Sequence, residues 1–274
     1  MHPILLRIGT YIVYSYTIAL ASGIAIGTWL AYRAARARLA DPVVLLDGAF
    51  WALVGGLVGA RAGYVFANWA YFAAHLVEAI DVRGGGLSWY GAWLGGAVAG
   101  TIWYALRDHF RPPLPDWRVL LDLVAPGLAL ASAVGWLGCL LTGAGYGTEA
   151  EGYQAPLGWV TAYMPDIYGV EQVRFLTQPI MIGWVLLLWG VLQLRPGALR
   201  RLPSGATFAL YLLLYALADG AIWFLRGDGT WRFVLWPAQW ASILQIGAAL
   251  VLIVHAWAKK RRQQPTMAHS SSVG

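Results

Sequence analysis

Residues 45–66 read LLDGAFWALVGGLVGARAGYVF, and this stretch decides the fold class. It exceeds the roughly 20 mostly apolar residues that an α-helix needs to cross the hydrocarbon core of a bilayer. Asp47 and Arg61 are its only charged residues. Apolar residues run on continuously instead of alternating with polar ones, which favours a helix over a strand of a membrane barrel. We therefore expect a membrane-spanning helix here.

The rest of the chain repeats this pattern. Its 274 residues are 59% hydrophobic and 12% charged, with a mean hydropathy of +0.59, and this charged share is about half that of a soluble domain. We predict an all-α, multi-pass (polytopic) membrane protein whose seven transmembrane helices form one domain over residues 1–262. The seven segments are 11–32, 45–66, 87–106, 119–142, 179–194, 205–225 and 236–258.

The basic residues predict the orientation of these helices. Thirteen of the 19 Lys and Arg residues fall in segments 33–44, 107–118, 195–204 and 259–262, which seven alternating helices assign to one face. The positive-inside rule makes that face cytoplasmic. We therefore expect the N-terminus outside and the C-terminus in the cytoplasm.

Two segments lie outside the predicted helix bundle. The longest loop, 143–178, falls on the outer face and is rich in aromatic residues, so we expect it to fold as an outer cap. The last residues, 263–274, read QQPTMAHSSSVG and predict a disordered cytoplasmic tail.

Charge and cysteine content argue against several functions. The net charge is +6, and most basic residues are split among four separate loops, so the charge predicts topology and attraction to anionic lipid rather than nucleic-acid binding. Cys139 is the only cysteine and lies in an apolar segment, which gives neither a disulfide framework nor a Cys-rich metal site. We interpret Cys139 as a small buried apolar residue, and we expect no metal and no cofactor.

Small residues recur at a spacing of four within the predicted helices. This spacing places them on one helix face, where they let two helices approach closely in lipid. We therefore interpret them as helix-packing positions. They are Gly23 and Gly27; Gly55, Gly59 and Gly63; and Gly91 and Gly95.

Ionisable residues within a span are costly and are candidates for function. Arg61 and Asp219 are the clearest cases. Arg61 either snorkels to the outer interface or faces the interior of the protein. Asp219 either forms a purely structural pair or belongs to the functional site. Arg174 and Arg226 add two guanidiniums on the outer side, where Arg226 alone would be an ordinary rim charge. Planar guanidiniums suit phosphate recognition, so an anionic phospholipid headgroup is the candidate ligand.

The stretch GGGLSWYG, residues 84–91, precedes the third predicted helix. Gly85 and Gly86 allow backbone conformations that other residues rarely adopt, so the chain can pass close to a ligand. Ser88 and Tyr90 place polar groups at the helix entrance. The same glycines would also suit a plain turn.

Four features resemble the phosphatidylglycerol–prolipoprotein diacylglyceryl transferase family, and the likeness extends over nearly the whole chain. Residues 85–96, GGLSWYGAWLGG, are similar to the family's G-G-x-S-x-H-G-G motif, with Tyr90 in place of histidine. Residues 59–65, GARAGYV, resemble its G-x-R-x-G-Y segment, and residues 174–179, RFLTQP, resemble its R-H-P-S-Q segment. Tyr16 falls where the first helix of the family carries a tyrosine.

The resemblance implies a seven-helix enzyme of the bacterial plasma (inner) membrane. Such enzymes move a diacylglyceryl group from phosphatidylglycerol to the lipobox cysteine of a prolipoprotein, making a thioether and releasing glycerol phosphate. The expected partners are phosphatidylglycerol or another anionic phospholipid and the prolipoprotein signal peptide. We expect catalytic roles for Tyr90 and Arg61. The expected substrate-binding residues are Tyr16, Tyr64, Gly85, Gly86, Ser88, Arg174, Gln178, Asp219 and Arg226.

The sequence also departs from the family pattern. Residues 135–142, GWLGCLLT, stand where the family has G-R-x-G-N-F-x-N, so Trp136 replaces an arginine and Cys139 an asparagine. Asp219 stands where the family has an arginine in the sixth helix. Tyr90, with an ordinary pKa of about 10, is a poor base near neutral pH unless a neighbouring arginine lowers that value.

These departures leave two hypotheses of different classes. The first is a diacylglyceryl transferase. The second is a catalytically degenerate paralogue that binds phospholipid or lipoprotein without transferring. A small-solute transporter is disfavoured because the sequence has no evident inverted repeat or paired broken helices.

Overall fold

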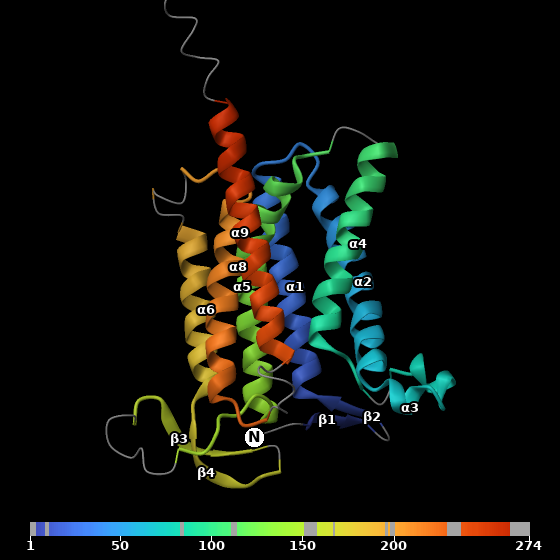
Figure 1. Ribbon diagram of the computed structural model, residues 1–274, viewed down its shortest axis with the longest axis vertical. Coiled ribbons are helices and arrows are strands. Elements are labelled where there is room, and N and C mark those ends of the chain that lie inside the picture. The colour runs from blue at the N-terminus through green and yellow to red at the C-terminus, as the bar shows by residue number, and fades with distance from the viewer. Residues whose placement is uncertain are drawn as a thin grey trace, which may run out of the picture. The chain divides into compact units, whose positions relative to one another are not determined.

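The computed structural model describes residues 4–8, 11–82, 85–110, 114–150, 158–166, 168–194, 197, 201–228 and 237–263. This part of the chain is mostly helical, as predicted, with two added antiparallel hairpins (Figure 1). The predicted disordered tail lies outside the described residues from position 264 onward. In chain order the elements are β1 (Ile4–Ile8), β2 (Tyr11–Tyr14), α1 (Ser15–Arg36), α2 (Val43–Ala67), α3 (Trp69–Phe72), the 3₁₀ turn η1 (Leu76–Ala79), α4 (Trp89–Phe110), α5 (Trp117–Thr142), β3 (Thr161–Pro165), β4 (Glu171–Phe175), α6 (Thr177–Leu194), α8 (Ala206–Ile222), the 3₁₀ turn η2 (Trp223–Leu225) and α9 (Pro237–Gln263).

Each of the seven predicted segments contains a long helix. Within the described residues, six helices are long and apolar enough to cross a membrane: α1, α2, α5, α6, α8 with η2, and α9. The third predicted segment is α4, which has 22 residues and so measures about 33 Å at 1.5 Å per residue, but it is less apolar. The structure therefore supports a multi-pass membrane protein, and the seventh span stays a prediction.

The predicted start of the first helix is wrong. Residues 11–14 form β2, and α1 begins at Ser15. β2 pairs with β1 in a register that sets Arg7 opposite Ile12 and Ile8 opposite Tyr11. Its sequence, YIVY, consists of aromatic and β-branched residues that favour strands, and hydropathy alone does not distinguish such a strand from the end of an apolar helix.

The helices cluster into two compact units, residues 1–31 with 121–274 (unit 1) and residues 32–120 (unit 2). In unit 2, α2 packs on α4 through glycines. A β-carbon at Gly59 would lie 2.7 Å from Cα of Gly95, and one at Gly55 would lie 2.7 Å from the carbonyl oxygen of Gly95. Both distances are too short for a side chain, so the predicted role of these glycines in helix packing is confirmed.

In unit 1, α5, α6 and α8 enclose a core that includes Trp136, Met181, Val185, Tyr211 and Tyr215. Hairpins β1–β2 and β3–β4 lie at the same end of this unit, where α1 begins and α5 ends (Figure 1). The β3–β4 hairpin folds part of the predicted cap, although residues 151–157 and 167 of that segment lie outside the described residues.

At the beginning of α8, a carboxylate from α5 caps the helix. Oδ2 of Asp122 accepts a hydrogen bond from the N–H of Gly205 at 2.7 Å, and Oδ1 accepts one from the N–H of Phe208 at 2.9 Å. Main-chain N–H groups at the start of a helix have no partner within the helix. Asp122 therefore satisfies two of them and ties α5 to α8.

Candidate functional site

Arg226 follows η2, and several groups fix its side chain. Its Nε donates a hydrogen bond to Oδ1 of Asp228 at 2.8 Å, and its Nη2 donates one to Oδ2 at 2.7 Å. This two-point pairing is the strong geometry between a guanidinium and a carboxylate. The guanidinium carbon also lies 3.8 Å from the ring centre of Trp223 and 5.9 Å from that of Trp136, within range of cation–π attraction.

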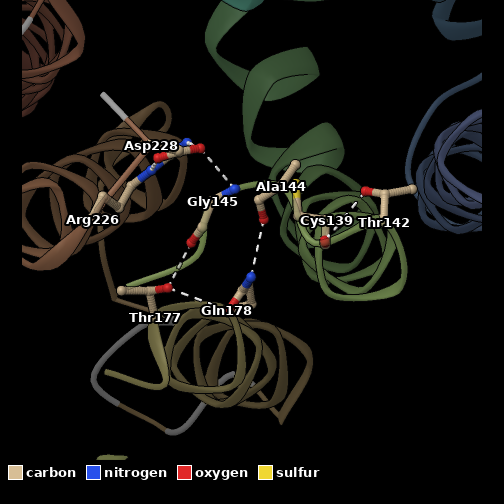
Figure 2. Close-up of polar contacts among 8 residues, drawn as sticks. All are labelled: Cys139, Thr142, Ala144, Gly145, Thr177, Gln178, Arg226 and Asp228. Atoms are coloured by element: carbon tan, nitrogen blue, oxygen red, sulfur yellow. Dashed lines mark hydrogen bonds and ion pairs between the residues drawn. The ribbon is translucent and has the colours of Figure 1, made fainter. Parts of the chain in front are cut away.

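Asp228 also binds the loop that follows α5. Its Oδ2 accepts a hydrogen bond from the N–H of Gly145 at 2.8 Å (Figure 2). Gly145 has a φ of 71°, a conformation that favours glycine. Beside this contact, the N–H of Gly227 donates to the carbonyl of Tyr146 at 2.8 Å. The segment after α8 is therefore fixed to the loop after α5.

The start of α6 holds the same loop from its other side (Figure 2). Oγ1 of Thr177 donates to the carbonyl of Gly145 at 2.6 Å, and Nε2 of Gln178 donates to the carbonyl of Ala144 at 3.1 Å. Both side chains are fully buried. Gln178, a predicted substrate-binding residue, thus has a structural contact with the main chain beside Arg226.

Arg174, on β4, is buried and paired within the cap. Its Nη2 lies 3.3 Å from Oε1 of Glu149 and 3.3 Å from Oδ2 of Asp166, and its guanidinium carbon lies 5.0 Å from the ring centre of Tyr146. Burial raises the pKa of Tyr146, and the carboxylates of Asp166 and Asp228 raise it further. Two acidic neighbours make Arg174 less suited to a phosphate than Arg226, and its predicted substrate contact stays a prediction.

Asp219 lies on α8 two turns before Arg226. Its Oδ2 accepts a hydrogen bond from Oγ of Ser242 on α9 at 3.1 Å, and Trp223 is a further hydrogen-bond partner of the carboxylate. Arg226 follows Trp223 by three residues, and its guanidinium lies over the Trp223 ring. Trp223 therefore contacts both charged groups. Asp219 and Arg226 therefore belong to one continuous set of contacts along the end of α8.

Cys139 lies on α5, and Tyr16 lies on α1 where that helix packs against α5. Cys139 is partly buried and packs against the core of unit 1, in keeping with its interpretation as an apolar residue. Tyr16 of α1 packs on α5 at Gly138, where an added β-carbon would lie 3.1 Å from Cδ2 of the tyrosine. Tyr16 is half-buried.

Unit 2 holds the other predicted residues, arranged around Arg61. The guanidinium donates four hydrogen bonds to main-chain carbonyls: to Ala79 from Nε at 2.8 Å, to Glu78 from Nη2 at 2.6 Å, and to Gly85 and Gly86 from Nη1 at 3.0 Å each. An arginine has five N–H donors. The side chain thus turns toward the glycine run, as expected for an inward-facing residue, and most of its donors serve the main chain of residues 78–86.

The described glycines of the run, Gly85 and Gly86, adopt backbone conformations that favour glycine, and Gly86 also packs closely on Tyr64 and Arg61. Gly85 and Gly86 have φ values of 83° and 74°. A β-carbon at Gly86 would lie 2.6 Å from Tyr64 and 2.8 Å from Nη1 of Arg61, whereas one at Gly85 would meet nothing within 4 Å. Gly84 lies outside the described residues. The backbone conformation therefore favours glycine at both positions, whether or not a ligand also approaches there.

Ser88 and Tyr90 lie where α4 begins. Oγ of Ser88 accepts the N–H of Gly91 at 3.2 Å, which caps the helix, and the N–H of Ser88 donates to the carbonyl of Ala60 at 2.8 Å. Tyr90 is half-buried. The predicted residues thus form two groups: Arg61, Tyr64, Gly85, Gly86, Ser88 and Tyr90 in unit 2, and Tyr16, Arg174, Gln178, Asp219 and Arg226 in unit 1. A single cavity lined by both groups stays a prediction.

Sequence reasoning missed Asp228. It was absent from the candidates because it follows the sixth predicted span and looks like an ordinary loop carboxylate. The available signal was its spacing, since a carboxylate two residues after an arginine at a helix end can reach the guanidinium. Its hydrogen bond to Gly145, 83 residues away in sequence, had no local signal.

The contacts around Arg226 and Arg61 fall within the region that known proteins match. A sequence model described as prolipoprotein diacylglyceryl transferase matches residues 3–255. The chain belongs to this family. The match covers all the predicted site residues and Asp228.

Individual relatives agree with this assignment. The chain is 32% identical over 263 residues to a phosphatidylglycerol–prolipoprotein diacylglyceryl transferase of Symbiobacterium thermophilum, covering 94% of this chain and 93% of the relative. It is 31% identical over 270 residues to the enzyme of that name from Nostoc sp., covering 95% and 90%. A third such relative, from Streptococcus agalactiae, is 27% identical over 266 residues, covering 96% and 98%.

Proposed function

We propose that this protein transfers a diacylglyceryl group from phosphatidylglycerol to the lipobox cysteine of a prolipoprotein. In this reaction the cysteine sulfur forms a bond to the glycerol carbon, and the bond from that carbon to the phosphate oxygen breaks. Glycerol phosphate leaves with the electron pair, and the thiol loses its proton. The observation that carries the proposal is the family match over residues 3–255, with relatives of that printed activity aligned along nearly the whole chain.

The leaving phosphate needs a cation, and we assign this role first to Arg226. Its position on Trp223 and its two-point pairing with Asp228 support a fixed guanidinium that costs little reorganisation when charge develops on the phosphate. Arg61 is the second candidate, because its donors also hold four main-chain carbonyls. Tyr90 remains our proposed acceptor of the thiol proton.

The remaining predicted residues are proposed to contact substrates. In unit 1, Asp219 and Gln178 lie next to the contacts of Arg226 and would position the headgroup or the peptide. Arg174 is better suited to ordering the cap. Tyr16, Tyr64 and Ser88 would line the path of the two lipidic substrates.

We further propose seven spans in the bacterial plasma membrane, with the N-terminus outside and the C-terminus cytoplasmic. Within unit 1, α8 begins and α9 ends on the side opposite the two hairpins (Figure 1). Lys259, Lys260 and Arg261 lie near the end of α9, and Nζ of Lys260 donates to the carbonyl of Arg201, which precedes α8, at 3.0 Å. This distribution supports the orientation by the positive-inside rule. The acceptor would then approach from the outer side as the signal peptide of a prolipoprotein.

Complementation tests this function in cells. The gene is expressed in a bacterium depleted of its own transferase, and the lipobox peptide of a reporter lipoprotein is analysed by mass spectrometry. The proposal predicts the diacylglyceryl mass on the cysteine and restored growth. Normal expression without that mass would support the catalytically degenerate alternative.

A further inference from the structure

Asp228 has two kinds of partner at once. Its carboxylate accepts the Nε and Nη2 edge of Arg226 at 2.8 and 2.7 Å, and its Oδ2 also accepts the N–H of Gly145 at 2.8 Å (Figure 2). The side chains of Arg226 and Asp228 are each only 16% exposed. The pair is therefore well shielded from water. An ion pair at the surface, in contrast, is screened by water and is held less firmly in one geometry.

We infer that Asp228 is a positioning residue for Arg226, which sets the orientation in which the guanidinium meets the substrate phosphate. This inference rests on the proposed function. The fork of Asp228 holds the Nε and Nη2 edge of the guanidinium and so fixes its rotation. A phosphate that approaches Arg226 therefore meets a guanidinium of fixed orientation.

The aromatic neighbours make this orientation specific. Trp223 lies under the guanidinium at 3.8 Å and restricts its plane, but a flat ring does not by itself select a rotation within that plane. The two bonds to Asp228 select that rotation. Position errors of about 1 Å at a reacting group can cost roughly a hundredfold in rate, so the rotation of Arg226 matters for transfer.

Gly145 fixes Asp228 in turn. The glycine belongs to the loop between α5 and the cap, and its carbonyl accepts Oγ1 of Thr177 at the start of α6. Asp228 is therefore held from outside its own segment rather than moving together with Arg226. This anchor distinguishes a positioning carboxylate from a counter-ion that merely neutralises the arginine.

Substitutions at Asp228 test the inference. Asp228→Asn keeps the shape and loses the two-oxygen fork, whereas Asp228→Glu keeps the fork on a longer side chain. We expect kcat to fall about ten- to a hundredfold in the asparagine variant, with a smaller rise of about three- to tenfold in KM for phosphatidylglycerol because Arg226 keeps its charge. The glutamate variant should recover part of kcat. An asparagine variant more active than the glutamate variant would show that only shape matters and would overturn the inference.

A double-mutant cycle shows whether Asp228 acts through Arg226. In an Arg226→Gln background, Asp228→Asn should lower kcat by less than about twofold further, because coupled residues are not additive. Asp122→Ala is the control: it removes two hydrogen bonds at the opposite end of α8 and none of the contacts of Arg226, so it should lower thermal stability and leave kcat within about threefold. A full, additive effect of Asp228→Asn in both backgrounds would show a structural role instead.

Lipid retention separates this inference from the proposed function. Native mass spectrometry of the purified protein compares bound phosphatidylglycerol with phosphatidylethanolamine in the wild type, Arg226→Gln and Asp228→Asn. We expect the preference for phosphatidylglycerol to be lost in the first variant and reduced about three- to tenfold in the second. If the wild type transfers nothing but shows this order, the proposed function fails and the positioning role stands. Equal preference in the wild type and Asp228→Asn would overturn the positioning role.

Discussion

Nη1 of Arg61 donates a hydrogen bond to the carbonyl oxygen of Gly86 at 3.0 Å and so connects α2 to a residue 25 positions later. With its bonds to Glu78, Ala79 and Gly85, this side chain satisfies the carbonyls of an irregular segment between two long apolar helices. Unpaired main-chain groups are costly where water is scarce. An arginine inside an apolar helix is therefore explained here by main-chain pairing, in addition to any role with a phosphate.

Replacing Arg61 should loosen the segment that it holds. We expect Arg61→Gln to lower the free energy of unfolding by about 3 kcal/mol, since bonds to charged groups contribute about 1.5–3 kcal/mol each and some are replaced by water. The free energy of unfolding of Arg61→Lys should lie between those of the wild type and Arg61→Gln, because lysine keeps the charge and loses the planar fork. Thermal unfolding in detergent and the mobility of a spin label at Val77 measure the effect.

Arg36→Gln is the control for Arg61, because Arg36 is exposed at the end of α1. It should change neither the unfolding temperature nor the label mobility. Retention of phosphatidylglycerol in the same Arg61 variants tests the headgroup role separately. Unchanged stability in Arg61→Gln would contradict the main-chain role.

Gly85 and Gly86 provide a matched pair of substitutions. Both have positive φ, so alanine costs about 1–2 kcal/mol at either position. Only at Gly86 would the added carbon overlap Tyr64 and Arg61. We expect Gly86→Ala to lower the unfolding temperature clearly more than Gly85→Ala does. Equal effects of the two alanines would contradict the close packing of Tyr64 and Arg61 on Gly86.

Asp122 should stabilise the bundle through the start of α8. Asp122→Ala removes both bonds to main-chain N–H groups and should cost about 1–2 kcal/mol. Asp41 makes a comparable bond to the N–H of Val43 at 3.0 Å but is exposed, so Asp41→Ala should cost less. Chemical or thermal unfolding of the two variants in the same detergent gives the comparison, and a larger loss for Asp41→Ala would contradict the account.

The orientation can be tested within unit 1. Glu149 of the cap and Arg201 before α8 are both exposed and belong to the predicted outer and cytoplasmic sides. Single cysteines at these positions, in a Cys139→Ser background, should react with a membrane-impermeant maleimide in intact spheroplasts at Glu149 only. Permeabilised cells should label both. Labelling of both positions in intact spheroplasts would exclude the predicted topology.

The sequence was sufficient to predict the long helices, because continuous apolar segments are a strong and local signal. It failed at residues 11–14, where aromatic and β-branched residues are equally apolar in a strand and in a helix. Glycine spacing correctly indicated close packing of α2 on α4, since four-residue periodicity is also local.

The site was only partly predictable, because motifs are local in sequence whereas several contacts of the site are not. The motifs of residues 59–65 and 85–96 named Arg61 and the glycines, but the acceptors of Arg61 at Glu78 and Ala79 lie in a segment without a motif. Asp228 joins Arg226 to Gly145 over a long sequence separation. Such contacts depend on tertiary packing, which neither composition nor spacing encodes.

The central claim is tested most directly with purified protein in phosphatidylglycerol vesicles and a synthetic lipobox peptide. Mass spectrometry measures the diacylglyceryl adduct on the peptide cysteine, and an enzymatic assay measures released glycerol phosphate. Our account predicts both products in equal amounts, their loss when the cysteine is replaced by serine, and a rate at least about tenfold lower in Arg226→Gln. Intact, folded wild-type protein that retains phosphatidylglycerol but yields neither product would contradict it.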